Sequence, residues 1–141
     1  MRLKEILETK GGVVLTIERS ASLADVVRKM CDHNCGSLIV CEGDKLTGII
    51  SERDILRAIA ELDAPLETIT VEMRMTRDVV TGSPHDNINE TMGVMTRSRI
   101  RHLPVLEDGN LAGLISIGDI VKAQHQKLEQ ENHLLMTYIQ S

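Results

Sequence analysis

The sequence predicts an α/β protein made of two tandem copies of one β-α-β-β-α unit, followed by a long C-terminal helix. Three observations lead to this prediction. The phrase GIISERDIL at 48–56 returns as GLISIGDIV 65 positions later. The same offset aligns the flanking residues without a gap from Val14 onward, which indicates an internal repeat. Within each copy, short β-branched runs alternate with stretches whose apolar residues follow helical spacing.

The first copy opens with a β-branched run, VVLTI, that predicts a strand. Ser22 and Asp25 then fit a capping box at the start of a helix. The run SLIVC is continuously apolar, as in a strand buried on both faces, and the turn residues EGD lead from it into a further strand, LTGII. A second helix is expected from near Glu52 to about Leu62, with Pro65 just beyond it.

The second copy repeats this order. Its first strand ends in the stretch TGSPHDN, and Asp108 and Gly109 form a strong hairpin signal between its last two strands. The final helix is expected to begin near Ile117. The predicted segments are an N-terminal helix and lead-in at 1–12, a first repeat at 13–62, a linker at 63–75, a second repeat at 76–124 and a helical extension at 125–141.

Composition narrows the classes of function. Hydrophobic residues make up 42% of the 141-residue chain, which is enough for a buried core. The net charge of −5 argues against binding to nucleic acid or to an anionic membrane, because both need a positive field. Tyr138 is the only aromatic residue, so base stacking on an aromatic platform is also disfavoured.

The N-terminal stretch and the cysteines bear on location. MRLKEILE lacks the apolar centre of a signal peptide, and no apolar run reaches the length of a membrane span. Three cysteines without framework spacing fit a reducing compartment. We therefore expect a soluble, cytoplasmic protein.

The last helix places Val121, Leu128 and Leu135 seven residues apart and contains no breaker. Two interpretations are open. The helix docks on its own domain as an amphipathic helix, or it packs on a second subunit as a short coiled coil. Gln124 and Glu131, on a neighbouring line of the helix, weaken the coiled-coil seam.

The repeated phrase ends a buried strand and opens a helix in each copy. Its glycine allows another group to approach the backbone closely, a serine stands at the strand end, and an aspartate follows three residues later. One interpretation is a capping box, which contributes about 1 kcal/mol per helix. The other is a nucleoside site, in which the carboxylate accepts the ribose hydroxyls and the helix start receives a phosphate. Local sequence by itself favours capping.

These features together resemble a tandem pair of CBS domains, the regulatory modules named after cystathionine β-synthase. The resemblance covers roughly residues 10–125. It rests on the duplicated Gly-h-h-Ser-x-x-Asp motif, on RHLPV in the second copy and on MTRDVVT at its entry. The motif residues are Gly48, Ser51, Asp54, Gly113, Ser116 and Asp119.

The resemblance implies one α/β unit with pseudo-twofold symmetry, whose two clefts bind adenosine-containing ligands. Among these ligands, AMP or ATP is expected first, NAD(H) second and S-adenosylmethionine last. It also implies a disc-like homodimer. The expected function is a non-enzymatic sensor that changes conformation or assembly and acts on an unidentified regulated protein. The alternative is a structural dimerisation module whose clefts are vestigial.

The resemblance also implies the ligand-binding residues by position. Aspartates would hold ribose, serines would assist at ribose or phosphate, and the threonines of the first strands would line the base pocket with their backbones. The implied residues are Thr16, Gly36, Ser37, Ser51, Arg53, Asp54, Thr81, Arg99, Arg101, His102, Ser116 and Asp119.

The two copies differ where a phosphate would lie. Arg53 precedes the aspartate of the first copy, and Gly118 takes that place in the second. The neutral stretch before SLIVC corresponds in the second copy to a basic one that carries Arg99, Arg101 and His102. The resemblance makes these side chains phosphate candidates, so the two clefts are expected to be non-equivalent.

Other reactive side chains predict no further chemistry. Cys31, His33, Cys35 and Cys41 lack the spacing of a structural zinc site, and buried cysteine commonly serves as a small apolar residue. No nucleophile stands beside a base in the pattern that acyl transfer needs. We therefore expect neither a metal site nor an enzyme.

Overall fold

The structure, a computed structural model of the chain, describes residues 1–11 and 13–140. Its elements in chain order are α1 (Leu3–Lys10), β1 (Thr16–Ile17), α2 (Leu23–His33), β2 (Ser37–Glu42), β3 (Lys45–Ser51), α3 (Glu52–Glu61), the 3-10 turn η1 (Leu66–Thr68), α4 (Val71–Arg74), α5 (Ile88–Ser98), β4 (His102–Glu107), β5 (Asn110–Ser116) and α6 (Ile117–Gln140). The α/β class and the tandem repeat are thus confirmed.

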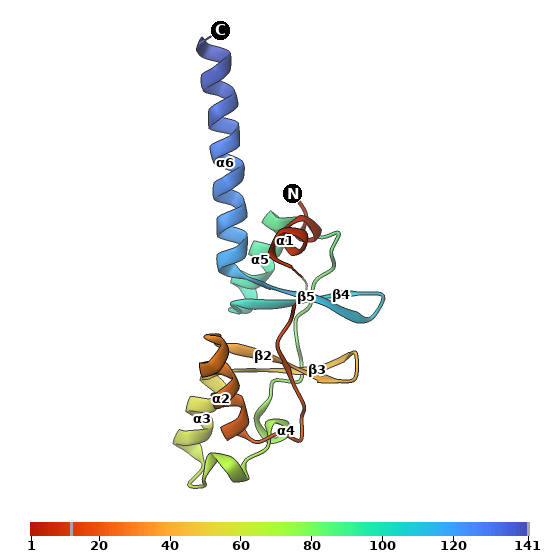
Figure 1. The fold of residues 1–141 in the computed structure, drawn as a ribbon, viewed down its shortest axis with the longest axis vertical. Coiled ribbons are helices and arrows are strands. Elements are labelled where there is room, and N and C mark those ends of the chain that lie inside the picture. The colour runs from red at the N-terminus through yellow and green to blue at the C-terminus, as the bar shows by residue number, and fades with distance from the viewer. Residues whose placement is uncertain (12, 141) are drawn as a thin grey trace.

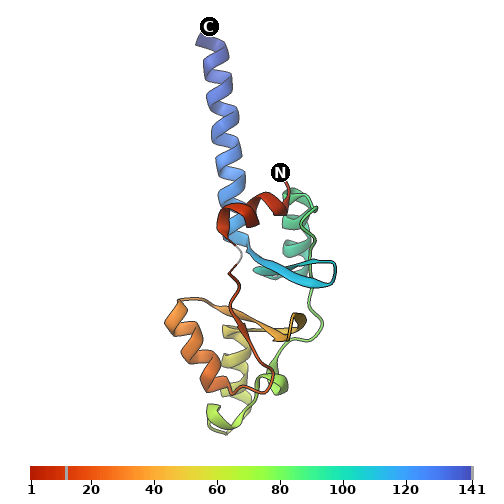
Figure 2. The same ribbon diagram turned by 45° about the vertical axis from the view of Figure 1, so that its right-hand side comes forward.

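The two halves are arranged around their hairpins. Figures 1 and 2 show the β2–β3 hairpin facing the β4–β5 hairpin, with α2 and α3 on the outer side of one and α1, α5 and α6 on the outer side of the other. The hairpins pair antiparallel in equivalent registers, and each has one irregularity, after Val40 and after Val105. The predicted turn residues Asp108 and Gly109 both have positive φ, at 52° and 81°, as a tight hairpin turn requires.

The second half lacks a counterpart of β1 among the described residues, so the strand predicted to end near Thr81 is wrong. In the first half, β1 runs parallel to β2, and the Ile39 N–H donates to the Leu15 carbonyl at 3.3 Å. The residue that corresponds to Ile39 is Pro104, which has no N–H to donate. One parallel bridge remains, at Gly82, and Thr81 lies in an irregular, exposed segment.

Each half buries the segment that precedes the other half. Leu3 and Ile6 of α1 lie in the hydrophobic core of the second half. Ile69, Val71 and Met75, from the connection between the repeats, lie in the core of the first half. The connection, predicted from sequence as a linker, therefore also supplies core side chains. We call these two segments the lead-ins, one before each repeat. Figures 1 and 2 show the lead-ins running past each other between the halves.

Backbone hydrogen bonds also join each lead-in to the half on which it packs. The Leu3 N–H donates to the Asp86 carbonyl at 3.0 Å, and the Val71 N–H donates to the Ala21 carbonyl at 2.8 Å. The acceptors stand 65 residues apart, like the rest of the repeat, whereas the donors stand 68 apart. The first lead-in is therefore three residues longer. The longer lead-in also has the longer helix, because α1 has 8 residues and α4 has 4.

The exchanged lead-ins explain the glycine of the repeated phrase. A Cβ on Gly48 would lie 2.8 Å from the Thr76 carbonyl oxygen and 2.9 Å from the Met75 sulfur. A Cβ on Gly113 would collide with a Leu7 methyl group. The close approach that the sequence indicated is therefore made by protein segments.

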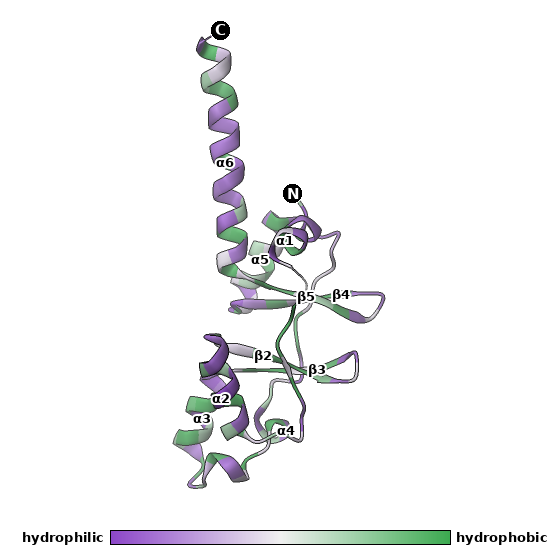
Figure 3. Cartoon of the chain, in the orientation of Figure 1, coloured by the Kyte–Doolittle hydropathy of each residue, from purple (hydrophilic) through white to green (hydrophobic). Residues whose placement is uncertain are grey.

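α6 leaves the body of the molecule after its first two turns. Ile120 and Ala123 are buried, and the Gln124 amide donates to Asn89 Oδ1 at 2.9 Å. All residues at 125–140 are exposed, and Figures 1 and 2 both show this part projecting away. The interpretation of a helix docked on its own domain is therefore wrong for 125–140. Figure 3 colours several residues of the projecting part as hydrophobic.

Gly48→Ala should lower the free energy of unfolding by about 1–3 kcal/mol, because the added methyl group must displace a backbone carbonyl in a packed region. Urea denaturation followed by circular dichroism measures this change. Gly118→Ala is the matched control. Its Cβ would meet only the Ser116 hydroxyl at 3.6 Å, and alanine is the better helix former, so no loss is expected. Wild-type stability for Gly48→Ala would contradict the packing role.

Candidate functional site

The aspartate of the first repeated phrase serves as a local cap. Asp54 Oδ2 accepts the Ser51 backbone N–H at 2.9 Å and the Ser51 hydroxyl at 3.1 Å. Its other oxygen, Oδ1, accepts no hydrogen bond from residues 1–11 or 13–140. The carboxyl is partly buried at the start of α3. One oxygen thus holds the strand–helix junction, and the other is free for a ligand.

The second phrase forms a complete capping box. The Ser116 backbone N–H donates to Asp119 Oδ2 at 2.9 Å, and the Asp119 N–H donates to the Ser116 hydroxyl at 3.0 Å. Asp119 Oδ1 also accepts no hydrogen bond within the described part of the chain. The capping interpretation therefore holds in both copies. Because it uses one oxygen of each carboxylate, it does not exclude ribose binding by the other.

Lys10 reaches Asp119, and sequence reasoning missed it. Its ammonium lies 2.7 Å from Asp119 Oδ2 and 2.9 Å from the Leu114 carbonyl oxygen. Burial acts to raise the pKa of the Asp119 carboxyl, but the hydrogen bonds from Lys10 and Ser116 outweigh it and lower the pKa below its usual value. Asp54 has no ion pair with any described residue, so the two carboxylates differ in their electrostatic surroundings.

His102 lies where the two halves meet. It stands opposite Ser116 in the β4–β5 ladder and is partly buried. Burial lowers the pKa of its imidazole below the usual value, and the charge of Lys10 lowers it further, although Asp119 and Glu52 act in the opposite direction. His102 is therefore neutral at neutral pH. Since Glu52 belongs to the first half, charges from both repeats act on this side chain.

The corresponding place in the first half is different. Ser37 stands opposite Ser51 and is 5% exposed. The Gly36 carbonyl accepts the Glu52 N–H at 3.0 Å, and a Cβ on Gly36 would lie 3.1 Å from Glu52 Oε1. A carboxylate therefore lies over Gly36, whereas the second half offers an imidazole. The surroundings of Ser37 and His102 therefore differ, and the expected non-equivalence of the two clefts stays a prediction.

The three arginine candidates are exposed. Arg53 lies in the first turn of α3, Arg99 ends α5 with φ at 54°, and Arg101 precedes β4. None of them forms an ion pair with a described residue. Their guanidinium groups are therefore unoccupied by protein carboxylates and can meet an anion.

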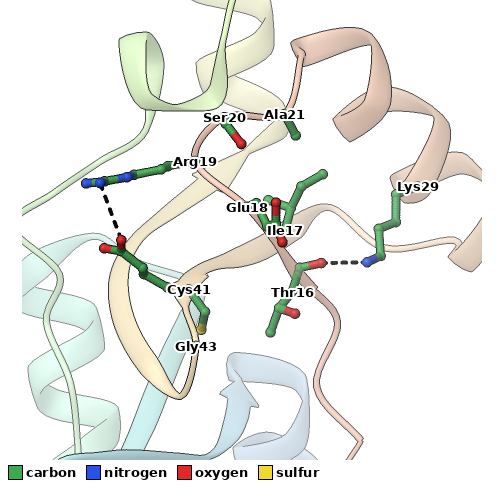
Figure 4. Close-up of a pocket in the computed structure, with 10 residues that line it drawn as sticks. Thr16, Ile17, Glu18, Arg19, Ser20, Ala21, Lys29, Cys41 and Gly43 are labelled. Atoms are coloured by element: carbon green, nitrogen blue, oxygen red, sulfur yellow. Dashed lines mark hydrogen bonds and ion pairs between the residues drawn. The ribbon is translucent and has the colours of Figure 1, made fainter.

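Thr16 lines an open pocket of about 740 Å³ beside β1. Figure 4 shows Lys29 reaching the Thr16 carbonyl, a hydrogen bond of 2.5 Å. Arg19 and Glu42, which also line the pocket, form an ion pair at 3.4 Å. This volume suits a small molecule. Neither Ser51 nor Asp54 lines the pocket, so the structure does not gather all the candidate residues around one cavity.

The cysteines and histidines form no metal centre in the described ranges. Residues 1–11 and 13–140 contain no group of three or more His, Cys, Asp or Glu side chains that could hold a metal ion. Cys31 is exposed, and Cys35 and Cys41 are partly buried. Burial raises the pKa of the Cys41 thiol, and the charge of Asp44 adds to this effect.

A family model for the CBS domain matches the chain twice, at residues 4–61 and 69–126. The chain belongs to the CBS-domain family. The first matched region begins within α1, the second begins just before α4, and both end beyond the repeated phrase. One CBS domain in sequence therefore includes a lead-in that packs on the other CBS domain in space. CBS pairs are regulatory modules, and the recognition made from the duplicated motif is confirmed.

Relatives and solved structures agree with this assignment. The CBS domain-containing protein CBSX3, mitochondrial, from Arabidopsis thaliana is 34% identical over 98% of this chain and 71% of its own length. The crystal structure of a CBS-domain containing protein from Agrobacterium tumefaciens is 35% identical, with a TM-score of 0.83 over 88% of this chain and 99% of that one. The CBS domain pair of protein MJ0100, solved with 5′-methylthioadenosine and S-adenosyl-L-methionine, is 26% identical, with a TM-score of 0.78 over 90% of this chain and 98% of that one.

Across residues 1–11 and 13–140, no helix combines the length and the apolar character that crossing a bilayer requires.

His102→Gln should change how stability depends on pH. An unfolded histidine takes up a proton near pH 6.5, roughly the reference value, while folded His102, with its lowered pKa, resists protonation. The wild type should therefore lose stability relative to His102→Gln as pH falls from about 6.5 through the folded pKa. Urea denaturation of both proteins from pH 7.5 to pH 5 measures this. A constant stability difference over that range would contradict the burial of a neutral imidazole.

Proposed function

We propose that this CBS pair is a regulatory sensor of adenosine-containing ligands, with AMP, ADP or ATP, or NAD(H) as the ligand class and S-adenosylmethionine placed after them. The observation that carries the proposal is the duplicated carboxylate. Asp54 and Asp119 each keep one oxygen free in the first turn of the helix that follows a strand. The adenosine compounds bound by the related MJ0100 pair support the same ligand class.

Ribose recognition would use these free oxygens. A carboxylate accepts hydrogen bonds from both hydroxyls of a ribose diol, the role an acidic residue also has in dinucleotide-binding folds. Ser51 and Ser116, at the same junctions, would assist at ribose or phosphate. The backbones of Thr16 and Thr81 would line the base positions. With Tyr138 the only aromatic residue, aliphatic side chains would flank the adenine ring.

Phosphate recognition would differ between the two sites. Arg101 and His102, with Arg99, would serve the second repeat, and Arg53 the first. Exposed guanidinium groups without carboxylate partners can bind a phosphate bidentately. Gly36 and Ser37 leave the first repeat without a counterpart of this basic stretch. One cleft would therefore prefer the more highly phosphorylated or dinucleotide ligand.

The signal would be a change of conformation or assembly. A ligand shifts an equilibrium only by the difference between its affinities for the two states. No catalytic step is proposed. The protein would be cytoplasmic and would act on a regulated partner protein. A purely structural dimerisation module with vestigial clefts is the second candidate, and the projecting apolar part of α6 favours it.

Assembly would use α6 in a homodimer. Leu128, Leu134 and Leu135 are 63%, 67% and 58% exposed, because no other element among the described residues covers them. Val121, Leu128 and Leu135 lie on one line of the helix, as in the seam of a short coiled coil. A second copy of α6 would bury this line.

Adenine ligands should stabilise the wild type against heat. At a ligand concentration a hundredfold above Kd, the stabilisation should be about 2.7 kcal/mol. Asp54→Ala or Asp119→Ala should weaken binding by roughly 1.5–3 kcal/mol at the altered site, because each removes hydrogen bonds to a charged acceptor. Thermal melting and isothermal titration with AMP, ATP, NAD(H) and S-adenosylmethionine measure these effects.

The matched ligand control is 2′-deoxy-AMP. If it binds as tightly as AMP, the ribose role of the aspartates is wrong. If none of the four ligands raises the melting temperature, the structural module becomes the better account.

Leu128→Asp with Leu135→Asp should dissociate the proposed homodimer, because a buried seam would then hold unpaired charges. Sedimentation velocity over a range of protein concentrations measures the oligomeric state. Gln130→Asp, on the opposite side of the same helix, is the matched control and should remain a dimer. A monomeric wild type, or a dimer unaffected by both leucine changes, would refute assembly through α6.

A further inference from the structure

The two ribose candidates differ in one contact that the internal repeat does not duplicate. Asp119 is paired with Lys10 at 2.7 Å, whereas no cation pairs with Asp54 among residues 1–11 and 13–140. Lys10 is the last residue of α1, in the extra helical length that α4 lacks. The 68-residue offset between the lead-ins maps Lys10 onto Asp78, which lies beyond the end of α4 and carries the opposite charge.

The position of Lys10 is set by a well-anchored helix. Leu3 and Ile6 of α1 are 0% and 8% exposed in the core of the second repeat. The ammonium itself is held more loosely. The Lys10 side chain is 40% exposed and that of Asp119 is 24% exposed, so the pair lies at the edge of the protein rather than in its core. A lysine ammonium on a flexible stem can exchange partners at such a place.

Lys10 is also one of the cations that act on His102. Its charge is the largest charge effect on the partly buried imidazole of His102, and Arg101, which is next in the chain, acts in the same direction. Lys10 and Arg101 thus bring two positive charges to bear on His102, on which the Asp119 carboxylate also acts. The first repeat has Gly36 and Ser37 in place of Arg101 and His102, and Glu52 lies beside Gly36.

We propose that Lys10 makes the Asp119 site selective for phosphorylated adenosine ligands. The inference rests on the proposed function and specifies it for one of the two sites. In the ligand-free protein, the Lys10 ammonium neutralises Asp119 and weakens it as an acceptor of ribose hydroxyls. A ligand phosphate beside His102 and Arg101 gives the ammonium a second partner and releases the carboxylate for ribose. A neutral nucleoside offers no such partner and must compete with Lys10. The Asp54 site has no such lysine and lacks this selection.

Lys10→Met tests the proposal, because it keeps the length of the side chain and removes its charge. Binding of AMP and adenosine is measured by isothermal titration in an Asp54→Ala background, which leaves Asp119 as the ribose carboxylate. With Lys10 present, AMP should bind at least tenfold more tightly than adenosine. Lys10→Met should reduce this preference about tenfold or more, the scale of a hydrogen bond between charged groups. Lys10→Arg should retain most of it.

Lys4→Met is the matched control, since Lys4 is an exposed lysine of the same helix and the charge change is identical. It should leave the preference unchanged. Circular dichroism checks that each variant is folded, and the charge-retaining Lys10→Arg covers the case in which Lys10→Met does not fold. An equal AMP-to-adenosine ratio with and without the Lys10 charge would overturn the role of Lys10 while leaving the proposed function intact. Binding of neither ligand to the wild type would overturn both. The two failures are therefore distinguishable.

Discussion

The packing of each lead-in against the opposite repeat is the constraint on which the rest of the structure depends. Neither half closes its core alone, because Ile6 belongs in sequence to the first CBS domain and, with the preceding Leu3, completes the core of the second. Val71 and Met75 make the reverse contribution. Burying a large aliphatic side chain stabilises by roughly 1.5–3 kcal/mol, so a handful of these contacts matches the net stability of a small domain. The halves are consequently held together, and groups from both can act on one site.

The packing of the lead-ins also explains which features the two repeats share and which features differ between them. Glycine is required in both phrases because a lead-in presses on that backbone, by way of Thr76 in one half and Leu7 in the other. Beyond this contact the lead-ins diverge. The longer α1 carries Lys10 to Asp119, while the shorter α4 ends before it could supply a counterpart. A difference of three residues in a packing element thus becomes a difference in charge at a proposed binding site.

Most of the fold could be predicted from the sequence, because its signals are local. The capping pair Ser22 and Asp25 and the turn at Asp108 each depend on neighbouring residues, and the 65-residue repeat is found by aligning the chain with itself; all are present in the structure. The loss of a strand opposite Pro104 had a readable signal too, since proline has no N–H. The contact between Lys10 and Asp119 had none. It joins residues 109 positions apart and follows from the exchange of lead-ins, which a comparison of the two copies does not reveal.

Capping and ligand binding were opposed interpretations of one phrase, and the geometry makes them complementary. A capping box needs one carboxylate oxygen, and an aspartate has two. The Ser116 N–H donates to Asp119 Oδ2 and the Asp119 N–H donates to the Ser116 hydroxyl, which fixes the carboxyl in place, so its second oxygen is already oriented before any ligand arrives. Such preorganisation reduces the entropy lost on binding. A capped helix start is common, so the cap by itself cannot identify a site. Specificity then has to come from the side chains around the fixed oxygen, and those are the positions at which the two CBS domains differ.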